Sequence, residues 1–294
     1  MKRIISEDRV VDLVVDLLLM IVGILTLYPF YYTIVCSFSD GIDLLKGGVY
    51  LWPRKFTLAN YHLFLTDPDW IHAFGVSVAR TVIGTLCCIT CTSLFSYALS
   101  RKNLLFRNTY RFMVVFTMYF SGGLIPFYIL LKNLGLLNSF GVYIVPALLN
   151  TFFVITGMNF FSSIPESVLE SARIDGAREL QIFRKIVFPV SKPFIATLSL
   201  FVAVGQWNSW LDSAYYVRDK GLQTLSYKMM MIINQSISSA ANSEVAGQIS
   251  EANSATNFTI QSTAMVISML PIMCIYPFLQ KYFVQGMMIG AVKE

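Results

Sequence analysis

Charged residues are scarce in this sequence. Asp, Glu, Lys and Arg make up only 13% of its 294 residues, whereas 55% of the residues are hydrophobic. A soluble domain carries about 25% charged residues, so this chain has too little charge to cover a surface in water. Its mean hydropathy of +0.62 leads to the same conclusion. The composition excludes an ordinary soluble domain and indicates that lipid surrounds much of the protein.

Residues that bind metals or phosphates are also few. The two histidines, His62 and His72, do not have the spacing of a ligand pair on one helix. No glycine is followed by lysine, so the sequence lacks a nucleotide-hydrolysing P-loop. Cysteines 87, 88 and 91 lie among apolar residues, where thiols act as small hydrophobes. We therefore expect no metal, cofactor or catalytic centre in this chain. The net charge of only +5 also argues against a face that binds nucleic acid.

Six runs are long and apolar enough to cross a bilayer. A spanning helix needs about 20 mostly apolar residues. Arg80, in the outer third of the second run, is the only Asp, Glu, Lys or Arg in these runs, and we expect it to reach the headgroups. The near absence of intramembrane charge argues against an ion-coupled pump. The sequence thus predicts an all-α integral membrane protein with one transmembrane domain over residues 1–294, whose spans cover residues 17–38, 74–100, 112–131, 142–162, 193–211 and 258–279.

Lys and Arg are distributed unevenly between the two sides of these spans. Fourteen of the 22 basic residues lie at the chain ends and in the loops after the second and fourth spans, and seven lie in the other loops. Loops rich in Lys and Arg stay in the cytoplasm. The distribution predicts a multi-pass protein whose N- and C-termini are both cytoplasmic.

The loop between the fourth and fifth spans, residues 163–192, has a regular pattern of its own. Ser163 and Glu166 flank Pro165 in the arrangement of a capping box, which predicts a helix start. Gly176 suggests a point where the helix turns or where another surface approaches closely. The pattern alone also fits an amphipathic helix on the membrane surface. Apolar residues recur at steps of three or four and form a stripe of Leu169, Ala172, Gly176, Leu180 and Phe183.

Three short motifs in this loop are spaced as in the EAA loop of ABC-importer permeases. Glu170-Ser171-Ala172 precedes Asp175-Gly176-Ala177, and Ile186-Val187-Phe188-Pro189 follows after eight residues. Ser171 replaces the family's alanine and Phe188 its leucine, but neither change alters the spacing. The chain therefore resembles these permeases.

Further elements narrow the resemblance. Gln206-Trp207-Asn208-Ser209-Trp210 is similar to the Trp-Asn element of sugar permeases. The six spans resemble the second permease subunit of the maltose-type carbohydrate importers. The C-terminal run from Tyr276 is similar to the ending of permeases for complex oligosaccharides and polysaccharides, although Glu294 stands where that branch often ends in glycine.

The resemblance implies a non-catalytic ABC type I importer permease in a bacterial cytoplasmic membrane. It implies three kinds of partner besides membrane lipid: a homologous second permease subunit, two cytoplasmic ATPase subunits that hold ATP and Mg²⁺, and an extracellular or periplasmic carbohydrate-binding protein. A cytoplasmic coupling helix would dock on the ATPase through its apolar stripe and flanking charges. The coupling residues implied are Glu170, Ser171, Ala172, Asp175, Gly176, Ala177, Ile186 and Pro189.

Polar amides within the spans are the candidates for a substrate pathway between this subunit and its homologue. Each of them could instead bond a neighbouring helix. The candidates are Asn150, Asn159, Gln206, Asn208 and Gln261, with Trp207 or Trp210 to stack on sugar rings. The alternative function is an ion-coupled secondary transporter of a small polar solute, in which the loop at 163–192 is only a surface helix.

Overall fold

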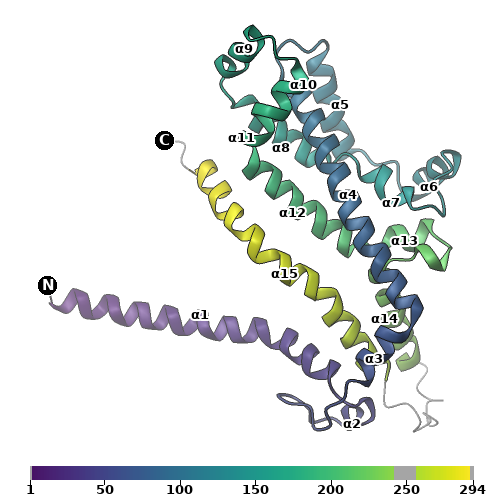
Figure 1. Cartoon of the computed structure of the whole chain (residues 1–294). Helices are drawn as coiled ribbons and strands as arrows, with labels where there is room; N and C mark the ends of the chain where they lie inside the picture. The colour runs from purple at the N-terminus through teal and green to yellow at the C-terminus, as the bar shows by residue number, and fades with distance from the viewer. Residues whose placement is uncertain (1, 242–255, 292–294) are drawn as a thin grey trace. The chain divides into compact units, whose positions relative to one another are not determined.

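A computed structural model describes the backbone of residues 2–241 and 256–291, and the side chains of residues 9, 11–235, 256 and 258–275 (Figure 1). Within these residues the structure is helical, with one isolated bridge between Ser39 and Phe56. The all-α fold class is confirmed. The chain forms two compact units: one comprises Met1–Pro68 and Met229–Leu270, and the other Asp69–Lys228 and Pro271–Glu294.

In the first unit, the C-terminal end of the long helix α1 (Lys2–Ser37) is fixed by a buried asparagine. Asn60 of helix α3 (Ala59–Thr66) is 1% exposed, and its amide donates to the carbonyl oxygens of Ser37 and Ser39 at 3.0 and 3.1 Å. Its oxygen accepts a hydrogen bond from Thr259 Oγ1 at 3.1 Å. Asn60 thereby joins α1 to the first turns of α15 (Asn257–Ala291). The short helix α2 (Gly41–Leu45) lies between α1 and α3 in the sequence.

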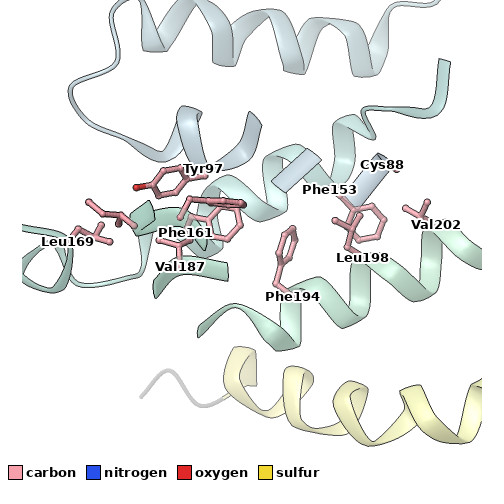
Figure 2. Close-up of a cluster of buried hydrophobic side chains, with 11 residues drawn as sticks. Cys88, Tyr97, Phe153, Phe161, Leu169, Val187, Phe194, Leu198 and Val202 are labelled. Atoms are coloured by element: carbon pink, nitrogen blue, oxygen red, sulfur yellow. The ribbon is translucent and has the colours of Figure 1, made fainter. Parts of the chain in front are cut away.

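The core of the second unit lies between α4 (Pro68–Ser100), α8 (Thr151–Ser162) and α12 (Lys192–Asn208) (Figure 2). Phe153, Phe161, Phe194 and Leu198 are buried where these helices meet. Gly157 of α8 permits the close packing, because an added Cβ would lie 2.7 Å from Cζ of Phe194. The helices α9 (Glu166–Ile174) and α10 (Glu179–Ile182) extend the same core beyond the end of α4.

Three candidate spans are single helices and three are broken. Val11–Ser37, Pro68–Ser100 and Phe258–Ile275 are long and apolar enough to span, and three bent helix pairs bring the total to as many as six. The pairs are α5 (Arg107–Tyr119) with α6 (Leu124–Asn133), bent by 119°; α7 and η1 (Gly141–Ala147) with α8, bent by 44°; and the segment Glu179–Val190 with α12, bent by 83°. The other helices after α12 and before α15 are α13 (Leu211–Tyr216), η3 (Lys220–Leu222) and α14 (Leu225–Ala241).

The expected continuous span over residues 112–131 is therefore two helices. Helix α5 ends at Tyr119, and Phe120 is extended. Gly123 has φ 87° and ψ 176°, a conformation that is essentially limited to glycine. The Gly122-Gly123 pair thus explains the break, because glycine destabilises a helix and permits the chain to turn before α6. The fifth expected span also ends early, at Asn208 rather than residue 211, because Ser209 is extended.

Candidate coupling loop and buried polar cluster

The loop at 163–192 folds into a series of short helices, with the π-helix η2 (Phe183–Val187) and α11 (Phe188–Val190) after α10. The expected capping box is wrong. The Ser163 hydroxyl donates to the Phe160 carbonyl at 2.7 Å and closes the end of α8, whereas Pro165 precedes α9 without a side-chain cap. Ser163 is drawn to α8 because the last carbonyls of a helix have no partner within it.

The apolar stripe of the loop packs mainly on the chain itself. Leu169 is fully buried, and Ala172 and Phe183 contact the same core as Phe161 and Phe194 (Figure 2). The expectation that the whole stripe docks on another protein is therefore wrong, because Leu169 is used to hold the loop against the spans. Leu180 departs from the stripe and is 68% exposed, and Ile174 is 86% exposed.

Gly176 terminates α9 in a Schellman motif. Its amide donates to the Arg173 carbonyl at 3.0 Å, and the Ala177 amide donates to the Ala172 carbonyl at 3.0 Å, the two bonds that define this helix end. Gly176 has φ +79°, and no other group lies within 4 Å of the position that a Cβ would take. The sequence allowed two interpretations of Gly176, a turn of the helix or a close approach of another surface. Within the described residues, the turn at the end of α9 explains the glycine.

Charged side chains tie the loop to the end of α4. Glu179 accepts from the Tyr97 hydroxyl at 2.8 Å and from Arg173 Nε at 2.8 Å. Arg173 also lies 3.6 Å from Glu166. Burial raises the pKa of Glu179, but the bonds from Tyr97 and Arg173 outweigh this effect and keep the pKa below its ordinary value. The bond to Glu179 raises the pKa of Arg173. The sequence pattern gave no signal for Tyr97, because the hydroxyl of one tyrosine near a span end is not distinctive.

The loop contains a hollow of about 440 Å³ between the end of α9 and η2. It brings together four of the implied coupling residues, Asp175, Gly176, Ala177 and Ile186. The other lining residues are Gln181, Ile182 and Lys185. Of the remaining implied residues, Glu170, Ser171 and Pro189 are exposed on the loop and Ala172 is half-buried, and none of these four lines the hollow.

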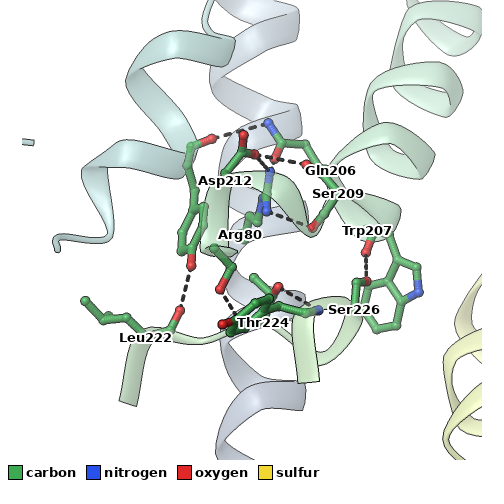
Figure 3. A network of polar contacts seen from close by, with 11 residues as sticks. Arg80, Gln206, Trp207, Ser209, Asp212, Leu222, Thr224 and Ser226 are labelled. Carbon is green, nitrogen blue, oxygen red and sulfur yellow. Dashed lines mark hydrogen bonds and ion pairs between the residues drawn. The ribbon is translucent and has the colours of Figure 1, made fainter. Parts of the chain in front are cut away.

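A second cluster forms around Arg80 on α4 (Figure 3). Arg80 is 2% exposed, so the expectation that it reaches the headgroups is wrong. Its Nε donates to Gln206 Oε1 at 2.8 Å, its Nη1 donates to the Ser209 carbonyl at 3.1 Å, and its Nη2 pairs with Asp212. The guanidinium carbon lies 4.5 Å from the ring centroid of Tyr143. Arg80 thus donates to groups at the C-terminal end of α12, where the helix leaves the Ser209 carbonyl unpaired, and to Asp212 of α13.

The expected pathway residues have different surroundings in the structure. Gln206 serves Arg80 and donates to the Tyr143 carbonyl at 3.4 Å, so its amide joins helices (Figure 3). Trp207 is buried edge-on against Phe74, with ring centroids 5.9 Å apart. Asn150 caps α8 by accepting from the Phe153 amide at 3.2 Å. Asn159 of α8 and Asn208 of α12 are exposed, whereas Trp210, between α12 and α13, and Gln261 of α15 are half-buried.

The exposed break between α5 and α6 is a feature that the search for polar side chains missed. Residues 120–123 are all exposed within this chain, and their backbone lies in the middle of an apolar run. Non-helical backbone at membrane depth is tolerated where it is covered by protein or lines water. The Gly122-Gly123 pair is the sequence signal that could have located it.

Residues 89–289 match the family described as the binding-protein-dependent transport system inner membrane component. This chain belongs to that family. Such a component is a membrane protein that works with a substrate-binding protein and an ATPase. The family match covers the coupling loop, Gln206 and Asp212, but not Arg80.

Full-length relatives of this family member are similar throughout. Protein LplC of Bacillus subtilis is 37% identical over 98% of this chain and 96% of the relative. The polygalacturonan/rhamnogalacturonan transport system permease protein YtcP of the same organism is 37% identical over 98% of this chain and 99% of the relative. A chain from a bacterial ABC transporter that imports the acidic polysaccharide alginate is similar in structure, with a TM-score of 0.83, 30% identity, and coverage of 94% of this chain and 98% of that one.

Proposed function

We propose that this chain is the permease subunit of an ATP-driven importer of carbohydrate, with oligosaccharides or polysaccharide fragments as cargo. The observation that carries the proposal is the full-length similarity to the polygalacturonan/rhamnogalacturonan permease YtcP and to the alginate importer chain. A permease for arabinooligosaccharides from Halalkalibacterium halodurans is also similar, at 24% identity over 92% of this chain. These relatives favour an ABC importer over the ion-coupled secondary transporter.

The coupling loop is proposed to dock on the ATPase through the hollow between Asp175 and Ile186. Leu169 and Phe183 fix the loop on the core, and Glu179 fixes it on Tyr97 of α4. Because the loop has buried contacts to α4, α8 and α12, it would move with these helices as one body. ATP and Mg²⁺, held by two ATPase subunits, would supply the energy, and this chain would transmit it as alternating access.

The substrate pathway is proposed to lie between this chain and a homologous second permease subunit. Two breaks support this location: the exposed backbone at 120–123 and the end of α12 at Asn208. Both carry polar groups and aromatic side chains, Phe120 and Trp210, that suit a sugar ring. Both termini would lie in the cytoplasm, and the binding protein would dock on the opposite face of the membrane.

Reconstitution tests the function directly. The permease pair is assembled with its ATPase in vesicles, and ATP hydrolysis is measured with the binding protein loaded with neutral or acidic oligosaccharides. Stimulation by a loaded binding protein, together with uptake that requires ATP, would support the proposal. Uptake that an ionophore abolishes, and that persists without any ATPase, would instead establish the secondary transporter.

A further inference from the structure

A basic segment lies at the end of α4 and the start of α5, residues 101–111. It contains four cations, Arg101, Lys102, Arg107 and Arg111, and no acidic residue. The segment lies at the same end of the second unit as the coupling loop, because Arg101 Nη2 donates to the Phe161 carbonyl at the end of α8 at 3.3 Å. A run of cations next to a spanning helix is the pattern that attracts anionic lipid headgroups.

Two of these cations share one carbonyl oxygen as their hydrogen-bond acceptor. Arg107 Nε and Arg111 Nη2 both donate to the Leu99 carbonyl, each at 3.2 Å. Arg107 Nη2 also donates to the Ser100 carbonyl at 3.1 Å. The two guanidinium groups are four residues apart on α5 and therefore share a face, where like charges repel. The neutral carbonyls offer only the partial negative charge of a helix end.

No carboxylate neutralises this pair within the described part of the chain. The ion pairs there involve other cations, and Glu179, which lines the same cavity as Arg101, is bonded to Arg173 and Tyr97. Arg111 Nε and Arg101 Nη1 are buried without a hydrogen-bond partner. Arg107 and Arg111 are half-buried, and their Nη1 groups take part in none of the bonds to α4. The pair therefore has unneutralised charge, and its two Nη1 groups, which are neither bonded nor fully buried, can reach an anion.

The residues beside the pair are unusually apolar for a turn. Leu105 is 75% exposed and Phe106 is 71% exposed, and Phe112 follows on α5 as another exposed aromatic. Cations beside exposed apolar side chains suit the boundary between headgroups and acyl chains. A soluble phosphate would account for the cations but not for Leu105 and Phe106. The occupant that matches both is a lipid.

We propose that Arg107 and Arg111 bind the phosphate of an anionic phospholipid, with Leu105 and Phe106 against its acyl chains and Lys102 adding to the positive potential. The anion would balance the two guanidinium charges that meet at the Leu99 carbonyl. This lipid would thereby stabilise the α4–α5 connection beside the coupling loop. The proposal concerns lipid binding and does not depend on the substrate of the transporter.

Native mass spectrometry of the full chain, released from vesicles of phosphatidylglycerol mixed with phosphatidylcholine, tests this assignment. The double variant Arg107→Gln/Arg111→Gln keeps hydrogen-bond donors for Leu99 but removes both charges. At about 1 kcal/mol per juxtamembrane cation, the variant is expected to bind phosphatidylglycerol about thirtyfold more weakly. Arg107→Lys/Arg111→Lys keeps the charges and should retain most of the binding. Arg9→Gln, which removes an exposed charge on α1, should change it little.

Several results would overturn the proposal. Equal retention of phosphatidylglycerol and phosphatidylcholine would remove the charge selectivity, and undiminished phosphatidylglycerol binding by the Gln double variant would remove the site. An equal loss in Arg9→Gln would show general attraction to anionic vesicles. Binding of inorganic phosphate with similar strength would assign a soluble anion. A Gln double variant that binds lipid normally but assembles poorly with the ATPase would assign a protein interface. Thermal unfolding of each variant in detergent identifies any that fails to fold.

Discussion

Gly176 offers the sharpest test of how the coupling loop is built. Its φ of +79° lies in the left-handed region, and its Cβ position is open for 4 Å, so a substitution meets no steric clash and acts through the backbone alone. An ordinary side chain in this conformation costs about 1–2 kcal/mol, whereas asparagine tolerates it. If the loop must leave the Schellman motif to relieve the strain, its affinity for the ATPase falls by the same free energy. This corresponds to about five- to thirtyfold.

The expected order of coupling is therefore wild type, then Gly176→Asn, then Gly176→Ala, with Gly176→Val lowest. The measurement is the affinity of the reconstituted permease pair for its ATPase, together with ATP hydrolysis stimulated by the loaded binding protein. Gly75→Val is the matched control, because Gly75 is also exposed and open but lies within helix α4 at an ordinary φ. If Gly176→Asn is as defective as Gly176→Val, side-chain volume at the docking surface decides the effect and the backbone argument is wrong.

Three further perturbations probe the spans and the loop. Asp212→Asn removes the carboxylate beside buried Arg80 and is expected to destabilise the chain by about 3 kcal/mol in thermal unfolding. Adding Arg80→Met should restore part of this loss. Strictly additive effects of the two substitutions would refute the pairing. Gly157→Ala places a Cβ 2.7 Å from Phe194 and should lower stability by about 1–3 kcal/mol, and an unchanged melting temperature would contradict the close packing. Because the pKa of Glu179 is lowered, its stabilising effect should be complete above the ordinary value of about 4.3 and disappear as pH falls through the depressed value. The difference in melting temperature between wild type and Glu179→Gln should shrink accordingly, and a constant difference would contradict the ion pair.

Hydrophobicity and motif spacing predicted the helical fold and the coupling loop because both depend on patterns along the sequence. The apolar runs predicted six spans, since each contains about 20 residues with almost no charge, and the structure has a long helix or a bent helix pair at each of these positions. Gly176 was recognised as special, although spacing could not separate a helix end from a close approach. The carbonyl bonds of Arg173 and Ala172 separate the two. Such bonds depend on backbone conformation, which composition does not encode.

Polar contacts between distant segments were the part that the sequence could not supply. Arg80 and Asp212 are 132 positions apart, so the sequence singled out Arg80 as an isolated charge but did not indicate its partner. Treating each span as one uninterrupted helix also hid the break before Gly123, since Ser121, Gly122 and Gly123 carry no charge and do not interrupt an uncharged run. Leu169 was assigned to an external partner because periodicity identifies an apolar face but not the surface that covers it.

The break at 120–123 leads to a conclusion about assembly. A helix satisfies its own backbone groups, so a membrane tolerates it without further partners. Helix α5 stops at Tyr119 and α6 starts at Leu124 after a bend of 119°, which leaves the exposed backbone of the intervening residues without a continuous helix. The Phe120 amide and both the amide and the carbonyl of Gly123 are bonded within the chain. Hydrocarbon cannot pair the remaining groups of these residues, so protein or water must lie against them. A chain alone in lipid offers neither at this point. A second permease subunit that encloses a water-filled pathway offers both, which is why the break favours the proposed subunit interface over a permease that works alone.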